Sequence, residues 1–237
     1  MNLLEIRNVN KKFASRTVLR NINLAVGSGE IFGLIGLNGA GKTTLIKIIL
    51  DLLTADGGEC LILNKSSLDP AARSNIFYLP EKFQPPPNLK AIEFLKFFTA
   101  AKEIKTSELR GLCEALSLEY GDLGKRIGSL SKGMAQKIGL IASVLDNKKL
   151  IILDEPMSGL DPRARIYLKK FFLDYKNRGN SIFFSSHILS DVDEICDRIA
   201  IINDAEIGFT GSPAEFKKKC GENSLERAFL REIGETP

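Results

Sequence analysis

One short run constrains this 237-residue chain more than any other feature. Residues 36–43 read GLNGAGKT, which matches the phosphate-binding pattern GxxxxGK[ST] in full. The run follows a continuously apolar segment, residues 31–35, typical of a strand buried on both faces, and precedes a predicted helix over residues 44–53. Its three glycines let backbone N–H groups turn inward around an anion, and a helix N-terminus adds partial positive charge. The chain is therefore predicted to bind a nucleotide by its phosphates.

Side chains at the end of this loop and at the end of a later strand complete the predicted site. Lys42 can reach the β- and γ-phosphates, and the Thr43 hydroxyl can bind Mg²⁺. The apolar run 150–153 ends in Asp154 and Glu155, where the tip of a strand would lie beside the phosphate loop. We expect Asp154 to hold Mg²⁺, directly or through water, and Glu155 to orient or deprotonate the attacking water.

Apolar periodicity places these motifs in an α/β domain. Residues 3–9 and 18–26 alternate between apolar and polar side chains, as half-buried strands do. The runs 150–153, 182–184 and 199–202 are short and apolar and are separated by helical stretches, which is the pattern of a parallel sheet. Between about 89 and 145 the apolar spacing is helical, so this middle part is predicted to be an insertion between two strands of one sheet.

Composition argues against several other classes of protein. Hydrophobic residues make up 44% and charged residues 26%, which are ordinary values for a chain with a sizeable core. The net charge of +4 is dispersed and gives no case for nucleic-acid binding. Four widely spaced cysteines fit a reducing cytoplasm rather than a zinc site or a disulfide framework. We see no signal peptide and no apolar run near the ~18 residues that span a bilayer, so we expect any action at a membrane to require a partner.

A third motif narrows the choice among nucleotide hydrolases. Residues 130–136 read LSKGMAQ, which resembles the LSGGQ signature of the ABC transporter ATP-binding family. The run SGLD at 158–161 and His187 after two serines resemble the D-loop and the switch histidine of that family. The resemblance extends from Leu4 to about Leu230. It implies an α/β fold: a P-loop NTPase (RecA-like) core with an antiparallel β subdomain and an inserted helical subdomain.

The resemblance also implies roles for individual residues. His187 would bond the γ-phosphate and act with the catalytic Glu155, Phe13 would stack on adenine, and Ser131 would face the nucleotide of a second subunit. From the residues alone, Ser131 could equally be a plain helix N-cap, His187 a structural histidine and Phe13 a core aromatic. The implied nucleotide-binding set is Phe13, Gly36, Leu37, Asn38, Gly39, Ala40, Gly41, Lys42, Thr43, Thr44, Ser131, Gly133 and Asp161, and the implied metal ligands are Thr43, Asp154 and Glu81.

One position departs from the family pattern. Where the family usually has glutamine after a strand, this chain reads YLPE at 78–81. Glu81 could bind Mg²⁺ more strongly than an amide does, whereas Gln84 could take the role instead. The YLPE variant and the ending at 224–230 are similar to those of ABC-2 type export ATPases, so we interpret the chain as an active variant.

The expected protein is thus an ATPase that uses ATP and Mg²⁺ to power a membrane transporter, and the resemblance implies a transporter of the ABC-2 export type. Two copies, expected as a homodimer, would enclose two ATP molecules, and an integral-membrane permease subunit would contact residues 81–95, with their three prolines and exposed apolar side chains. The location implied is the cytoplasmic face of the cell membrane.

We expect one domain over 1–237, with a helical subdomain at about 88–146, a short tail at about 221–237 and no nucleic-acid partner. A soluble ABC ATPase that acts on ribosomes or DNA is the alternative. A P-loop kinase or GTPase would explain Lys42 and Thr43 but not the LSKG motif, Asp161 or His187.

Overall fold

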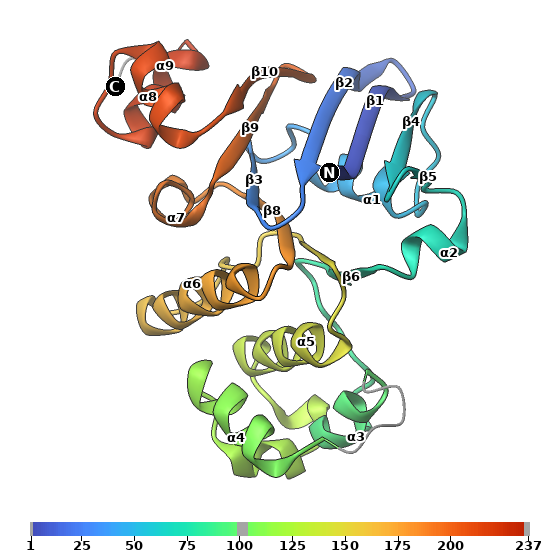
Figure 1. Ribbon diagram of the computed structural model, residues 1–237, viewed down its shortest axis with the longest axis vertical. Coiled ribbons are helices and arrows are strands. Elements are labelled where there is room, and N and C mark those ends of the chain that lie inside the picture. The colour runs from blue at the N-terminus through green and yellow to red at the C-terminus, as the bar shows by residue number, and fades with distance from the viewer. Residues whose placement is uncertain (1, 99–103, 235–237) are drawn as a thin grey trace.

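The computed structural model describes residues 2–98 and 104–234. Two β-sheets form the centre of the molecule, and helices pack against them (Figure 1). Met1 and the segments 99–103 and 235–237 lie outside the described residues, so the predicted helical subdomain and tail are described only in part. The division of the chain into these subdomains stays a prediction.

The larger sheet carries the predicted parallel strands. Its order is β10-β9-β3-β8-β7-β6, and all neighbours are parallel except the hairpin of β9 and β10. All five residues of β3 are buried, as its continuous apolar run predicted. The strands are β3 (Ile31–Ile35), β6 (Ile76–Leu79), β7 (Leu150–Leu153), β8 (Ser181–Ser186), β9 (Arg198–Asn203) and β10 (Glu206–Gly211).

The smaller sheet is antiparallel, which confirms the predicted β subdomain of the fold. Its order is β2-β1-β4-β5, made of β1 (Asn2–Phe13), β2 (Arg16–Gly27), β4 (Gly57–Ile62) and β5 (Lys65–Ser66). Helix α1 (Lys42–Ile49) contributes its apolar side chains to the core that this sheet shares with one face of the larger sheet. The two sheets also meet along β2 and β10, and the Arg20 N–H donates to the carbonyl of Ala205 nearby, at 2.7 Å.

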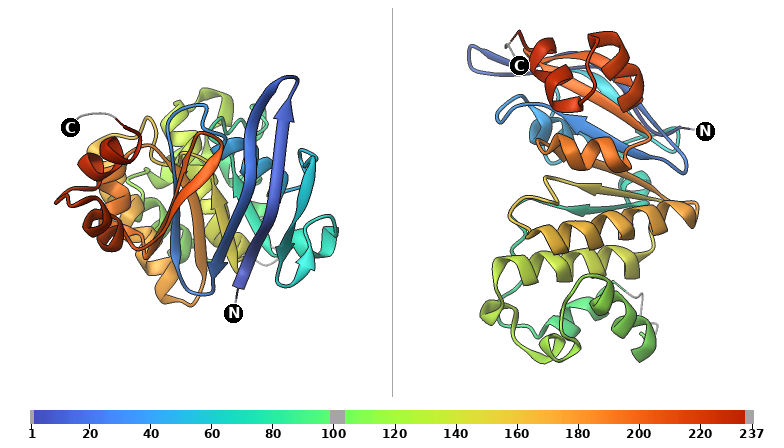
Figure 2. Two further views of the ribbon diagram at one scale, coloured as in Figure 1. Left: turned by 90° about the horizontal axis from the view of Figure 1, so that it is seen from above. Right: turned by 90° about the vertical axis from the view of Figure 1, so that its left-hand side faces the viewer.

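Most helices cover the other face of the larger sheet and build the second core (Figure 2). Helices α3, α4 and α5 gather at one end of the molecule, and α8 and α9 lie at the opposite end. The helices are α2 (Pro70–Arg73), α3 (Ala91–Lys96), α4 (Thr106–Ala115), α5 (Lys132–Asp146), α6 (Pro162–Asn177), α7 (Leu189–Ile195), α8 (Pro213–Cys220) and α9 (Leu225–Glu232). None of the helices in the described ranges combines the length and the apolar character that crossing a bilayer requires.

One predicted helix end was wrong. The helix predicted to reach residue 53 ends at Ile49, because Asp51 adopts a left-handed φ of 56°. The Leu52 and Asp51 N–H groups then bond back to the carbonyls of Lys47 and Ile48, at 2.8 and 3.0 Å, which closes the helix end. The described part of the middle of the chain is helical, as its apolar spacing predicted: it forms α3, α4 and α5 and two 3₁₀ turns.

The expectation of exposed apolar side chains within residues 81–95 was also wrong. Phe83, Leu89 and Ile92 are half-buried and pack against the core, and the three other apolar non-proline residues of the segment are buried. The reason is that α3 lies against α5 and the 3₁₀ turn Tyr120–Gly124, so its apolar face is covered. The exposed aromatic side chain is that of Phe97, just beyond the segment, which is 73% exposed.

Candidate functional site

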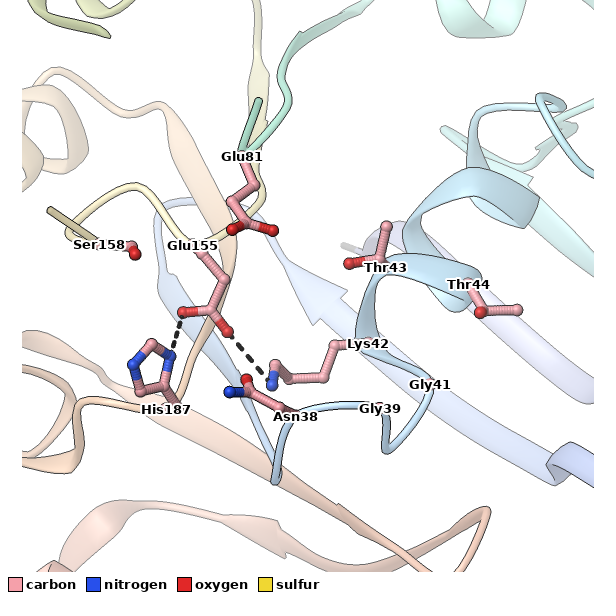
Figure 3. Close-up of a pocket in the computed structure, with 10 residues that line it drawn as sticks. All are labelled: Asn38, Gly39, Gly41, Lys42, Thr43, Thr44, Glu81, Glu155, Ser158 and His187. Atoms are coloured by element: carbon pink, nitrogen blue, oxygen red, sulfur yellow. Dashed lines mark hydrogen bonds and ion pairs between the residues drawn. The ribbon is translucent and has the colours of Figure 1, made fainter. Parts of the chain in front are cut away.

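Four loops that follow neighbouring parallel strands meet at one edge of the larger sheet. Residues 36–43 follow β3, Asp154 and Glu155 follow β7, His187 follows β8, and Glu81 lies two residues after β6. Because carboxyl ends of parallel strands share an edge, these side chains surround one cavity of about 520 Å³ (Figure 3). Its lining residues are Asn38, Gly39, Gly41, Lys42, Thr43, Thr44, Glu81, Glu155, Ser158 and His187.

Close packing requires glycine at two positions of the loop 36–43. A Cβ on Gly36 would lie 2.7 Å from both the side chain and the carbonyl oxygen of Ile202. A Cβ on Gly41 would lie 2.8 Å from the carbonyl oxygen of Val18, and the φ of Gly41 is 108°. No side chain caps α1, so the N–H groups of its first turn are left for an anionic ligand.

Lys42 lines the cavity, and its side chain is only 6% exposed. It donates to the carbonyls of Gly36 and Leu37, at 2.7 and 3.2 Å, and lies 3.2 Å from Glu155 Oε1. That contact is an ion pair and not a hydrogen bond. Glu155 Oε1 is a buried atom that has no hydrogen-bond partner in the described part of the chain. A phosphate entering the cavity would compete with this carboxylate for Lys42.

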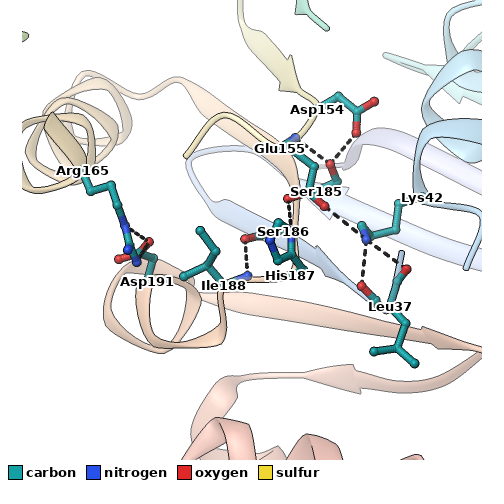
Figure 4. A network of polar contacts seen from close by, with 11 residues as sticks. Leu37, Lys42, Asp154, Glu155, Arg165, Ser185, Ser186, His187, Ile188 and Asp191 are labelled. Carbon is teal, nitrogen blue, oxygen red and sulfur yellow. Dashed lines mark hydrogen bonds and ion pairs between the residues drawn. The ribbon is translucent and has the colours of Figure 1, made fainter. Parts of the chain in front are cut away.

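Glu155 is held by its backbone as well as by its carboxylate (Figure 4). Its φ is 49°, a left-handed conformation that is uncommon for a residue other than glycine. The Glu155 N–H donates to Ser185 Oγ at 2.9 Å, and the Ser185 hydroxyl donates to Asp154 Oδ1 at 2.6 Å. His187 Nδ1 lies 2.8 Å from Glu155 Oε2. Because an ionised carboxylate can only accept, Nδ1 is the donor of this bond.

The three predicted metal ligands Thr43, Asp154 and Glu81 lie in different surroundings. Across residues 2–98 and 104–234, no group of three or more His, Cys, Asp or Glu side chains could hold a metal ion. Thr43 and Glu81 line the cavity, whereas Asp154 is 2% exposed and bonded to Ser185. Mg²⁺ usually takes one or two carboxylates and completes its coordination with water and substrate phosphates, so these residues fit an ion that arrives with a nucleotide.

The charge of Asp154 also acts on its neighbour in the YLPE run. Burial, and secondly the negative charge of Asp154, raise the pKa of Tyr78 to about 12. The phenol of Tyr78 therefore stays neutral at physiological pH and adds no negative charge beside the acidic residues.

Seven of the predicted nucleotide-binding residues lie outside the lining of the cavity, and four of these seven come from parts of the chain other than the loop 36–43. Phe13, at the end of β1, is 47% exposed, and the Lys11 ammonium lies 5.5 Å from its ring centroid. Ser131 caps α5 by accepting from the Met134 N–H at 3.2 Å, and Gly133 lies in the first turn of that helix. Asp161 caps α6 by accepting from the Ala164 N–H at 2.9 Å, and this bond is the main cause that lowers the pKa of Asp161.

The remaining predicted residues belong to the loop or lie near it. Gly36 is buried beneath the loop, Ala40 is half-buried and Leu37 is 49% exposed, with only its carbonyl turned to Lys42. Gln84, the alternative to Glu81, is exposed and does not line the cavity.

The sequence interpretation missed two contacts of the site. Ser185 joins Asp154 to the backbone of Glu155, and the available signal was a polar residue at the end of the apolar run 182–184. Arg16 Nη2 lies 3.4 Å from the carbonyl oxygen of Gly39, where the hairpin of β1 and β2 approaches the phosphate loop. Nothing in the local sequence around Arg16 indicates this long-range contact.

Known proteins resemble this chain in sequence and in fold. Residues 19–158 match the family described as ABC transporter. An uncharacterized ABC transporter ATP-binding protein of Synechocystis sp. is 40% identical over 83% of this chain, which spans 57% of that protein, less than two thirds of its length. A fluoroquinolones export ATP-binding protein of Mycobacterium tuberculosis is 35% identical over 86% of this chain and 68% of its own length. A solved structure of an ATP-binding subunit of an ABC transporter is 29% identical with a TM-score of 0.87, over 97% of this chain and 99% of that one.

Proposed function

Since this chain belongs to the ABC transporter family of ATP-binding proteins, we propose that it is the ATP-binding and ATP-hydrolysing subunit that powers a membrane transporter. The observation that carries the proposal is the hydrogen bond of 2.8 Å between His187 and Glu155 at the cavity that the phosphate loop forms. A buried carboxylate in that place can take a proton from a water molecule that attacks a phosphate.

Binding follows from the loop and its lysine. The β- and γ-phosphates lie against the free N–H groups at the start of α1, and Lys42 turns from Glu155 toward their negative charge. Phe13 supplies an exposed aromatic face for adenine. Thr43 and Glu81, which line the cavity, and the buried Asp154 would hold Mg²⁺, which would supply positive charge against the phosphates.

Hydrolysis then depends on Glu155 and His187. When Lys42 moves to the phosphates, Glu155 Oε1 loses its ion pair and becomes free to orient a water molecule and accept its proton. The Nδ1–H group of His187 holds the other carboxylate oxygen, and the exposed side of the ring would be available to bond the γ-phosphate. Ser185 keeps both acidic residues in place from beneath.

A second copy of the chain would complete the site. Ser131, Gly133 and Asp161 lie outside the cavity of their own chain, at the exposed starts of α5 and α6. A helix N-terminus offers N–H groups and partial positive charge, which suits the γ-phosphate bound by the other copy. Nucleotide binding would draw two copies together, and hydrolysis would let them separate.

The transporter itself requires a membrane-embedded permease subunit, which would place this chain on the cytoplasmic face of the membrane. We assign the contact with that subunit to residues 81–97, where Phe97 presents an exposed aromatic side chain next to the proline-rich segment. The direction of transport is outward in this proposal, which the export function named for the Mycobacterium tuberculosis relative supports.

Phosphate release by the purified full-length chain tests the proposal. The parent protein is expected to release phosphate from ATP only in the presence of Mg²⁺. Glu155→Gln should lower the rate by a factor of about 10² to 10⁴, since it removes the proton acceptor, and should leave ATP binding intact. Lys42→Ala should abolish ATP binding, as measured with a fluorescent nucleotide.

Glu226→Gln serves as the control, because Glu226 is an exposed carboxylate in the first turn of α9. Its rate should equal that of the parent. A parent protein that releases no phosphate, or a Glu155→Gln variant with the parental rate, would overturn the proposed function.

A further inference from the structure

A buried ion pair lies next to the site but outside the cavity lining (Figure 4). Asp191, in the first turn of α7, is only 3% exposed. Arg165 of α6 reaches one of its carboxylate oxygens with two nitrogens: Nε lies 2.7 Å from Asp191 Oδ2, and Nη2 bonds to the same oxygen. Lys169 Nζ lies 3.5 Å from the other oxygen but bonds more closely to Glu194 of α7, at an exposed second link between the same two helices, so Arg165 is the main partner of the buried carboxylate.

The two residues of the ion pair lie equally far along the chain from two loops of the site. Asp191 follows His187 by four residues, and Arg165 follows Asp161 by four residues. Each residue lies in the first turn of its helix, Asp191 in α7 and Arg165 in α6. The pair therefore cross-links the start of α7, just after the loop of His187, to the start of α6, just after the loop 158–161.

Hydrogen bonds restrict the backbone between the ion pair and each of the two loops. Ser186 Oγ accepts from the Ile188 N–H at 2.9 Å, which fixes the backbone on both sides of His187. Asp161 caps α6 through the Ala164 N–H at 2.9 Å. A shift of α7 along α6 would thus be passed on to His187 rather than absorbed by a flexible linker.

Apolar packing alone would not define the position of α7 as closely. Val192 and Ile195 bury their side chains in the core, but such contacts are not directional. Hydrogen bonds from a planar guanidinium group to a carboxylate do fix direction. A different ion pair, of Asp193 with Lys217 at 2.8 Å, joins α7 to α8. Neither of its residues belongs to the site.

We propose that Arg165 and Asp191 are positioning residues for ATP hydrolysis, which hold His187 within hydrogen-bonding distance of Glu155 by fixing α7 to α6. The inference rests on the proposed function, since it names residues that serve that reaction. The nucleotide cradle lies on β3 and α1, so loss of the ion pair leaves nucleotide binding untouched and weakens only the step that needs His187.

The test compares Asp191→Asn with Asp193→Asn, a matched variant that removes a carboxylate and an ion pair from the same short helix. Asp191→Asn is expected to lower kcat between about tenfold and about a hundredfold, the size of effect that misplacement of a reacting group produces. Its affinity for a non-hydrolysable ATP analogue should equal that of the parent. Asp193→Asn should keep the parental kcat, even where both variants lose a similar amount of Tm.

A second readout does not depend on turnover. His187 is the single histidine of the chain, so an NMR spectrum of the imidazole nitrogens reports on it without ambiguity. Asp191→Asn should move these resonances toward their positions in Glu155→Gln, in which the hydrogen-bond partner of His187 is changed. Asp193→Asn should leave them at the parental positions, and Asp191→Glu, which keeps the charge, should restore part of the parental spectrum.

Each outcome decides one of the two claims. If Asp191→Asn matches Asp193→Asn in kcat and in the imidazole spectrum, the ion pair only stabilises the fold and the inference is overturned. If the parent itself hydrolyses no ATP, the proposed function fails, and the imidazole spectra still show whether the ion pair positions His187.

Discussion

Among single residues, Ser185 does most to place the acidic pair of the site. Glu155 has a left-handed φ of 49°, and its N–H would have no acceptor without Ser185 Oγ at 2.9 Å. The same hydroxyl donates to Asp154 Oδ1, and Ser185 is fully buried, so water cannot replace it. A backbone strain of this kind persists only where surrounding contacts enforce it.

Ser185→Ala should therefore be costly. It leaves a buried N–H and a buried carboxylate oxygen without their partner, and the free energy of unfolding should fall by about 1–3 kcal/mol. Urea denaturation measures this loss. Ser143→Ala is the control, because Ser143 is equally buried but its hydroxyl only donates to the carbonyl of Leu140 in its own helix. Equal losses in the two variants would show that the contacts of Ser185 are not special.

Among the elements, α5 packs closely against its neighbours at Gly139. A Cβ there would lie 2.5 Å from Leu79 Cδ1 of β6 and 2.9 Å from Phe83 Cε1. Phe83 belongs to the segment that follows Glu81, so the absence of a side chain at Gly139 lets this segment lie flat on α5. The close contact explains why the proline-rich segment buries apolar side chains that its sequence suggested would be exposed.

The substitution of alanine for glycine should have opposite effects on two helices. Gly139→Ala overpacks the contact of α5 with β6 and should lower the free energy of unfolding by about 1–3 kcal/mol. Gly111→Ala, in α4, meets no heavy atom within 4 Å and should raise it by about 0.5–1 kcal/mol, because alanine favours the helix. Urea denaturation of both variants decides the matter, and a stabilised Gly139→Ala variant would contradict the packing argument.

For the whole molecule, the proposed function requires that two copies associate around nucleotide. The starts of α5 and α6, with Ser131 and Asp161, are exposed and lie outside the cavity of their own chain. They are thus available to a second copy, whereas Lys42, Glu155 and His187 already surround the cavity from within one chain.

Light scattering in the presence of ATP and Mg²⁺ measures this association. Glu155→Gln, which keeps ATP bound, should double its mass when ATP is added. The further change Ser131→Arg should prevent the doubling, because a long side chain obstructs the contact, and should leave the ATP affinity of the single chain unchanged, since Ser131 does not line the cavity. A mass that stays constant with ATP would argue against the two-copy arrangement.

The sequence by itself determined the features that depend only on residues close together in the chain. The loop 36–43 needs glycines, a lysine and a following helix within one short run, and the buried strands 31–35 and 150–153 show as continuous apolar segments. Ser131 and Asp161 likewise cap the helices that directly follow them. The resemblance to a known family then supplied the roles of Phe13 and His187, which no local pattern carries.

Only the tertiary structure decided which distant residues meet. The order of the strands brings Glu81, Glu155 and His187 to one cavity and sets Ser185 beside Asp154, because neighbours in a parallel sheet are far apart in the chain. The end of α1 at Ile49 and the burial of Phe83 depend on backbone conformation and on packing against other elements. The link between Arg165 and Asp191 has no sequence signature, because an ion pair across two helices is defined by their separation in space.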